Sequence, residues 1–296
     1  MSLLDNIINY KELATLPSVT KRVMDLLQDD DVDVRRIARI IERDPVLAFK
    51  VLRVVNSPVF ATPTRITSIH QAIMLMGFSR LTNIVLSVSI FSRFWFAKHK
   101  GVERLMNKFW WHSSSAGIVA KVVGSKIRED SHREIEVMGG LLHQIGKVAM
   151  LQYNVEQYKK VIQLILKEGM IDSMAEKKVF GLSHLNVGVE MATKWRLGDE
   201  MKSVMAYYQT PSKISGNKDL PASVGLASVV CAQHGADFYN GLRLNSITEA
   251  EQWKVLCESS ENLKTQGPNA ITENISQHLK ESAQYLIALK GNLASA

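Results

Sequence analysis

Hydrophobic residues recur every three or four positions along most of the chain, with polar residues between them. In segment 19–27, for example, Val19, Val23, Leu26 and Leu27 form one apolar stripe. This period is typical of amphipathic α-helices. No run of four to eight residues bounded by turn signals shows the alternating pattern of a strand. The pattern therefore predicts an all-α protein.

Capping residues set the boundaries of several predicted helices. Asp33 and Asp44 are placed as N-caps, and Pro45 suits the first turn of a helix. Gly77 is expected to end one helix and Ser79 to cap the next. Helices are predicted at about 19–27, 34–44, 45–56, 67–77, 79–95, 103–124, 131–151, 155–168, 172–180, 184–195, 199–207, 221–240, 247–260 and 272–290. The segments 56–67, 210–221 and 259–270 are rich in turn formers and are predicted to be loops.

Composition excludes several classes of protein. The chain of 296 residues is 46% hydrophobic and 22% charged, which is ordinary for a globular protein. The net charge of +7 permits an anionic partner without requiring one. Two cysteines without a CxxC spacing argue against a disulfide framework and for a reducing cytoplasm. We find no signal peptide, and the most apolar long stretch, 81–96, is shorter than the roughly 20 residues of a membrane span. We therefore expect a soluble cytoplasmic protein without membrane contact.

Three histidines are candidates for chemistry because each lies beside an apolar helical face. His112, His143 and His184 are placed where ligands of a helical-bundle metal site would project inward. The alternative is that each is a hydrogen-bonded core residue. A hydrolytic metal site also needs carboxylates, and the residue beside His143 is Gln144, an amide. The set consists of imidazoles without acidic partners.

The chain resembles the HDOD domain, a bacterial relative of the HD phosphohydrolases. The match covers residues 13–211, and its motifs are LPSVTKRVMDLL, ARIIERDPVLAFKVLRVVNSPVF, TSIHQAIMLMGFSRL, GGLLHQIGKVAM and FGLSHLNVGVEMATKWRL followed by YYQTP. The resemblance implies an HD-like helical bundle with a small N-terminal helical subdomain. It predicts an extension at 1–12, a subdomain at 13–100, the bundle at 101–211, and C-terminal helices at 212–296 that complete the bundle.

The resemblance also implies that the metal site of the HD enzymes has degenerated. His112 matches the first histidine of the site, whereas the His-Asp pair falls on His143 and Gln144. The position of the last aspartate best matches Gln233. His184 matches a histidine common in HDOD domains, and Tyr208 and Gln209 stand where many relatives have two histidines; these three are candidate pocket residues. We therefore expect no catalytic residue, no bound metal and no cofactor.

The function implied is that of a non-enzymatic signal-transduction or regulatory protein. No receiver or cyclase sequence is attached, so the partner protein is expected to act in trans. A cyclic dinucleotide or another small ligand is possible, with Arg80, Arg93 and Arg104 as candidate contacts because aromatic residues lie nearby. Such arginines are also typical of ordinary packing.

Two other functions are alternatives. One is a residual metal-dependent hydrolase acting on nucleotides or cyclic dinucleotides. The other is nucleic-acid binding through the basic N-terminal helices, whose order and spacing resemble a helix-turn-helix. We do not favour it, because a solvated basic face is the commoner cause of such a pattern. The basic residues are Arg35, Arg36, Arg39, Arg43, Lys50 and Arg53.

Overall fold

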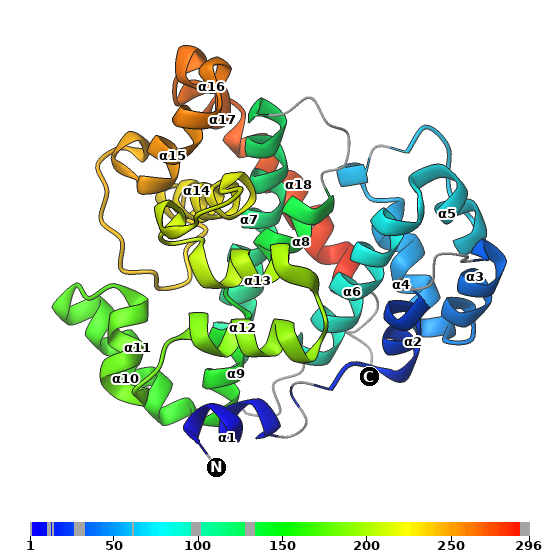
Figure 1. Cartoon of the computed structure of the whole chain (residues 1–296), viewed down its shortest axis with the longest axis horizontal. Coiled ribbons are helices and arrows are strands. Elements are labelled where there is room, and N and C mark those ends of the chain that lie inside the picture. The colour runs from blue at the N-terminus through cyan, green and yellow to red at the C-terminus, as the bar shows by residue number, and fades with distance from the viewer. Residues whose placement is uncertain are drawn as a thin grey trace. The chain divides into compact units, whose positions relative to one another are not determined.

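The computed structural model describes residues 2–10, 13, 15–26, 33–60, 62–95, 102–127 and 134–290. Within these ranges the regular structure is helical and no strand occurs, so the prediction of an all-α protein is confirmed (Figure 1). None of the helices in the described part of the chain is long and apolar enough to cross a membrane.

The chain divides into two compact units. The larger comprises Met1–Ala14 and Ala97–Leu279, and the smaller comprises Thr15–Phe96 and Lys280–Ala296. The division near residue 97 lies close to the predicted boundary at residue 100. The two ends of the chain differ from the prediction. The segment expected to be a separate extension, 1–12, belongs to the larger unit, where α1 (Leu3–Asn9) packs on α9 and α12. The residues from 280 onward group with the smaller unit instead of completing the bundle.

The smaller unit shows the capping chemistry that the sequence predicts. The Asp33 carboxylate accepts a hydrogen bond from the Arg35 amide, and Asp44 accepts one from the Leu47 amide. Gly77 ends a helix at φ 84°. The next helix begins at Phe78, so the predicted cap Ser79 lies inside it. The helices are α2 (Ser18–Leu26), α3 (Val34–Glu42), α4 (Pro45–Val55), the 3-10 turn η2 (Pro58–Phe60), α5 (Ile69–Met76), α6 (Phe78–Trp95) and the later part of α18 (Ile275–Lys290).

The larger unit is built around α7, which packs against α8 and α14. α10 and α11 pack against each other, and they contact α9 and α12 respectively (Figure 1). The helices are α7 (Glu103–Ile127), α8 (Glu134–Leu142), α9 (Ile145–Tyr153), α10 (Val155–Glu168), α11 (Asp172–Phe180), α12 (His184–Lys194), α13 (Gly198–Tyr207), α14 (Asp219–Gln233), α15 (Glu251–Ser259), α16 (Glu261–Gln266) and α17 (Asn269–Thr272), with 3-10 turns η3 (Pro211–Lys213) and η4 (Ile247–Glu249).

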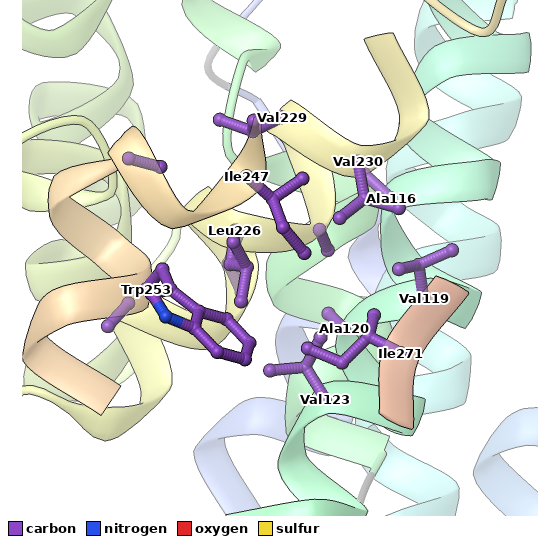
Figure 2. Close-up of a cluster of buried hydrophobic side chains, with 14 of the residues drawn as sticks. Ala116, Val119, Ala120, Val123, Leu226, Val229, Val230, Ile247, Trp253 and Ile271 are labelled. Carbon is purple, nitrogen blue, oxygen red and sulfur yellow. The ribbon is translucent and has the colours of Figure 1, made fainter. Parts of the chain in front are cut away.

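The core of the larger unit lies between α7 and α14. Ala116, Val119, Ala120 and Val123 follow the spacing of one helical face and are fully buried. They meet apolar side chains of α14, η4, α15 and α17, with Trp253 of α15 at the edge (Figure 2). This apolar core packs α7, which carries His112, against α14, which carries Ser228.

Three predicted elements differ from the structure. The segment 131–151 is not one helix, because α8 ends at Leu142 and α9 begins at Ile145; residues 131–133 lie outside the described ranges. The helix predicted at 221–240 ends at Gln233, before a glycine at φ 85°. The predicted loop 259–270 contains α16 and the start of α17. In α16 the Ser260 hydroxyl caps the Leu263 amide, so a residue interpreted as a turn former is an N-cap.

Candidate functional site

His112 and His143 meet in the interior of the larger unit, with ring centroids 5.4 Å apart. His112 comes from α7, and His143 lies in the turn between α8 and α9. His112 Nδ1 lies 2.7 Å from the carbonyl oxygen of Ala236, and His143 Nδ1 lies 2.7 Å from that of Gly140. A carbonyl oxygen only accepts, so both Nδ1 atoms carry a hydrogen. In the neutral rings both Nε2 atoms are therefore acceptors.

The Ser228 hydroxyl of α14 lies between the two imidazoles. Its Oγ is 3.2 Å from His112 Nε2 and 3.3 Å from His143 Nε2. A hydroxyl has one hydrogen to donate, so it serves one of the two Nε2 acceptors at a time. Burial lowers the pKa of His112 to about 4. Burial, and then the neighbouring His112, hold the pKa of His143 well below its ordinary value. Both rings are neutral at pH 7.

Gln144 occupies the interior next to His143 without joining this hydrogen-bonded group. Its side chain is fully buried, and neither Oε1 nor Nε2 makes a hydrogen bond to any described residue. It precedes α9 without capping it through its side chain. Burial raises the pKa of Tyr208 well above its usual value, and this effect exceeds the opposite influence of the nearby Gln144 side chain. Gln144 therefore supplies a neutral polar side chain where a carboxylate would place a charge.

A buried ion pair adjoins the histidines. Lys147 Nζ of α9 lies 2.6 Å from Asp172 Oδ2 of α11, and both side chains are fully buried. The ammonium also donates to the Phe238 carbonyl at 3.2 Å, and Gln209 Nε2 donates to Asp172 Oδ1 at 2.8 Å. Burial alone would raise the pKa of the Asp172 carboxyl, but the Lys147 charge brings the pKa below its ordinary value. The negative charge of the Asp172 carboxylate is thus balanced by the Lys147 ammonium.

His184 is the centre of a second buried chain of hydrogen bonds. Glu176 Oε2 accepts from the His184 backbone amide at 2.7 Å and lies 2.6 Å from its Nδ1. His184 Nε2 lies 2.8 Å from the Tyr208 hydroxyl, which in turn accepts from Gln209 Nε2 at 3.2 Å. Tyr158 donates to Glu176 Oε1 at 3.3 Å. The predicted pocket residues His184, Tyr208 and Gln209 therefore lie together, in a filled polar network that reaches Asp172.

Close helix packing positions these groups. A Cβ atom on Gly140 of α8 would lie 2.4 Å from the Cα of Gly117 in α7, so the two backbones touch where they cross. Only glycine permits this approach. The crossing lies five residues along α7 from His112 and three before His143 in the chain, and it brings the two imidazoles within reach of α14.

The structure places Gln233 away from the histidines. Gln233 is exposed at the end of α14 and donates to the Leu244 carbonyl at 3.2 Å. Ser228, earlier on the same helix, faces both rings instead. Sequence reasoning did not single out Ser228, Lys147, Asp172 or Glu176. For Lys147 a signal existed, because it lies in the LLHQIGK motif one helical turn after His143.

The three arginines predicted as ligand contacts lie on two helices. Arg80 and Arg93 lie on α6 in the smaller unit, and Arg104 lies on α7 in the larger unit. Arg93 and Arg104 are exposed, whereas Arg80 is partly buried.

The basic N-terminal face is smaller than the sequence predicts. Lys50 is buried and donates to the Ser92 hydroxyl at 2.9 Å, so it is not part of the surface. Arg53 donates to the Ile287 carbonyl at 3.4 Å and lies over the Phe49 ring. α4 begins at Pro45, almost directly after α3 ends at Glu42, without the three- or four-residue turn of a helix-turn-helix.

The donor atoms do not fit a divalent metal of the HD type. The two retained imidazoles are accompanied by a hydroxyl and a neutral amide, and these supply no negative charge. Asp172 and Glu176 are engaged by Lys147 and His184. Among the residues that the structure describes, no group of three or more His, Cys, Asp and Glu is arranged to hold a metal ion.

Comparison with known proteins gives the family. The sequence pattern of the HDOD domain matches residues 13–211. The chain belongs to the HDOD family. It is 22% identical over 220 residues to an uncharacterized protein of Treponema pallidum, and the match covers 74% of this chain and 42% of that protein. The chain thus spans less than half the length of that relative.

Solved structures share the fold. An HDOD domain protein of unknown function from Geobacter sulfurreducens matches with a TM-score of 0.72 and 22% identity over 97% of both chains. A Marinobacter aquaeolei protein, named as a candidate signal transduction protein, matches with a TM-score of 0.68 and 18% identity over 98% of this chain and 62% of its own. A Shewanella amazonensis protein, named as a candidate phosphohydrolase, matches with a TM-score of 0.66 and 17% identity over 97% of both chains.

Proposed function

We propose that this protein is a non-enzymatic signal-transduction or regulatory protein. The degenerate HD site is, in this proposal, a structural polar core, and the protein acts by binding a partner protein in trans or a small ligand. The name of the Marinobacter aquaeolei relative supports a signalling role, whereas that of the Shewanella amazonensis relative points to hydrolysis. The chemistry of this chain's own residues supports the signalling role over hydrolysis.

The observation that carries the proposal is the arrangement around Ser228. Two neutral imidazoles direct their Nε2 acceptors at one hydroxyl, and the adjacent residue is an amide. Metal-dependent hydrolysis requires an ion that acidifies a bound water, and such an ion needs anionic ligands and an open coordination position. Here His112, His143 and Gln144 are at most 1% exposed, so a phosphate ester has no access to them.

Elemental analysis tests the proposal directly. We expect protein purified without chelator to contain iron, manganese and zinc well below one atom per chain. The content should be the same in the wild type, in His143→Ala and in the exposed-site control His70→Ala. Stoichiometric metal that is lost in His143→Ala and kept in His70→Ala, together with phosphodiester turnover, would restore the hydrolase as the correct function.

A further inference from the structure

The loop after α14 forms one wall of the buried polar core. Three alternate residues of this loop use their carbonyl oxygens to hold that core. Ala236 accepts from His112 Nδ1 at 2.7 Å, Phe238 accepts from Lys147 Nζ at 3.2 Å, and Asn240 accepts from the Asp172 amide at 3.0 Å. The position of this short segment is therefore linked to both the imidazole pair and the ion pair.

The same segment borders a cavity of about 280 Å³ that the degenerate site does not use. Asp237, Tyr239 and Asn240 line it from the loop, and the ends of α10 and α14 form its other walls. Leu166 of α10 is 61% exposed and Leu242 is 38% exposed, so the cavity presents apolar surface to solvent. All of these residues belong to the larger unit.

Two side chains in the lining carry donors that have no acceptor among the residues that the structure describes. Asn240 is 5% exposed, its Oδ1 accepts from the Leu242 amide at 2.8 Å, and its Nδ2 has no partner among the described residues. Arg243 is exposed and has no carboxylate partner in the described part of the chain. The Asp237 carboxylate accepts from the Tyr239 amide at 2.9 Å and from the Asn240 amide at 3.4 Å, so it turns its charge towards the backbone. Arg243 is therefore the donor in the lining that an anionic ligand can reach.

We infer that this cavity binds a small organic anion, with one carboxylate or phosphate group and an apolar body. The anionic group accepts from Arg243, because a guanidinium pairs well with the oxygens of either group. The apolar body covers Leu166 and Leu242. The volume is at the lower limit of small-molecule sites, roughly 300 Å³, which restricts the ligand to a compact molecule.

Occupancy of the cavity is transmitted to the buried core through residues 236–240. A ligand in the cavity lies against Asp237, Tyr239 and Asn240, which belong to the segment whose carbonyls bind His112 and Lys147. The inference that an anion binds depends only on the cavity. The inference that this binding is regulatory rests on the proposed function. The loop is thus both a wall of the ligand site and a support of the degenerate site.

A titration of the full chain, labelled with ¹⁵N-histidine, tests the inference. Hexanoate and hexyl phosphate carry the anion and the apolar body. Hexanol lacks the anion, and acetate and inorganic phosphate lack the apolar body. We expect saturable binding of hexanoate or hexyl phosphate, with shifts in the ring-nitrogen resonances of His112, and at least tenfold weaker binding of the three partial probes. Whichever anion binds more tightly identifies the headgroup as carboxylate or phosphate.

Matched variants locate the site. Arg243→Ala should weaken binding at least tenfold, whereas Arg65→Ala, which removes an exposed arginine of the smaller unit, should leave it unchanged. Because both arginines are exposed, neither variant is expected to impair folding. Failure of both anions to bind, or equal affinity in the two variants, overturns the site. Binding without movement of the His112 resonances overturns the transmission. Neither result alters the metal content, which tests the proposed function separately.

Discussion

His112 and His143 illustrate how burial selects one protonation state for a histidine. Each ring has a fixed Nδ1–H donor to a backbone carbonyl, and each Nε2 faces the single hydroxyl of Ser228. A second proton on either ring would be placed in an interior already containing the Lys147 ammonium. Desolvation of that charge is the main reason that the pKa of each ring falls.

This arrangement predicts that stability falls in mild acid. The unfolded chain binds a proton at His112 near pH 6.5, whereas the folded chain does so only at a pKa of about 4. The unfolded state therefore binds more protons in that window, and the free energy of unfolding decreases as the pH falls from 6.5 to 4. The loss from His112 is about 3 kcal/mol, and His143 adds to it. Urea denaturation between pH 7.5 and pH 4 measures the change.

Two variants test whether His112 causes this pH dependence of the unfolding free energy. His112→Gln should reduce the pH dependence of the unfolding free energy, and His70→Gln, at an exposed histidine, should leave it as in the wild type. An unfolding free energy that is constant between pH 7.5 and pH 5, or a His112 ring that titrates near pH 6.5 by NMR, would contradict the neutral imidazole pair.

At the scale of the element, the crossing of α7 and α8 decides the geometry of the site. The break between α8 and α9 turns the chain at His143, and the Gly117–Gly140 contact sets how closely α8 approaches α7. Adjacent glycines of α8 have different roles. Gly140 faces the backbone of α7, whereas Gly139 faces the Val224 side chain.

The two glycines give a matched pair of substitutions. Gly140→Ala would place its Cβ 2.4 Å from the Gly117 Cα, so the helices must separate, and we expect the free energy of unfolding to fall by about 3 kcal/mol. Gly139→Ala would meet Val224 Cγ2 at 3.0 Å, which a side chain can relieve, and the gain in helix propensity of about 1 kcal/mol offsets the remaining strain. Chemical denaturation compares them. Equal losses in the two variants would show that the crossing is not tightly packed.

At the scale of the whole molecule, the end of the chain stabilises the smaller unit. Tyr285 of α18 is 1% exposed, and its ring centroid lies 6.4 Å from that of Phe60. Both residues belong to the unit formed by 15–96 and 280–296. The smaller unit therefore includes residues far beyond residue 211, where the HDOD match ends.

Tyr285→Ala should destabilise the smaller unit selectively. Removal of a buried aromatic ring costs about 3–5 kcal/mol. In hydrogen exchange measured by mass spectrometry, we expect faster exchange in α4 and α6 and unchanged exchange in α7 and α14. Ile287→Ala is the matched control, because Ile287 lies on the same helix and is 60% exposed. An equal increase in both units would mean that the chain opens as one cooperative body.

The sequence by itself determined the elements and the family. Most helices follow from a local period of apolar residues, and caps such as Asp33 and Asp44 need only the next few residues. The motifs quoted above, among them the DP-leading helix, the NSP turn and the LLHQIGK segment with His143, were sufficient to identify the HDOD family. The amide at Gln144 is a property of the sequence alone, and the prediction that an acidic ligand has been lost there rests on it.

Only the tertiary structure decided which polar groups meet. The apolar period continues through His143, so nothing local predicts the break between α8 and α9. Ser228 faces the histidines, and Gln233 does not, because the register of α14 against α7 is set by packing over the whole core. The Lys147–Asp172 pair joins residues on α9 and α11. Such contacts depend on how helices are oriented in space, which a one-dimensional pattern does not contain.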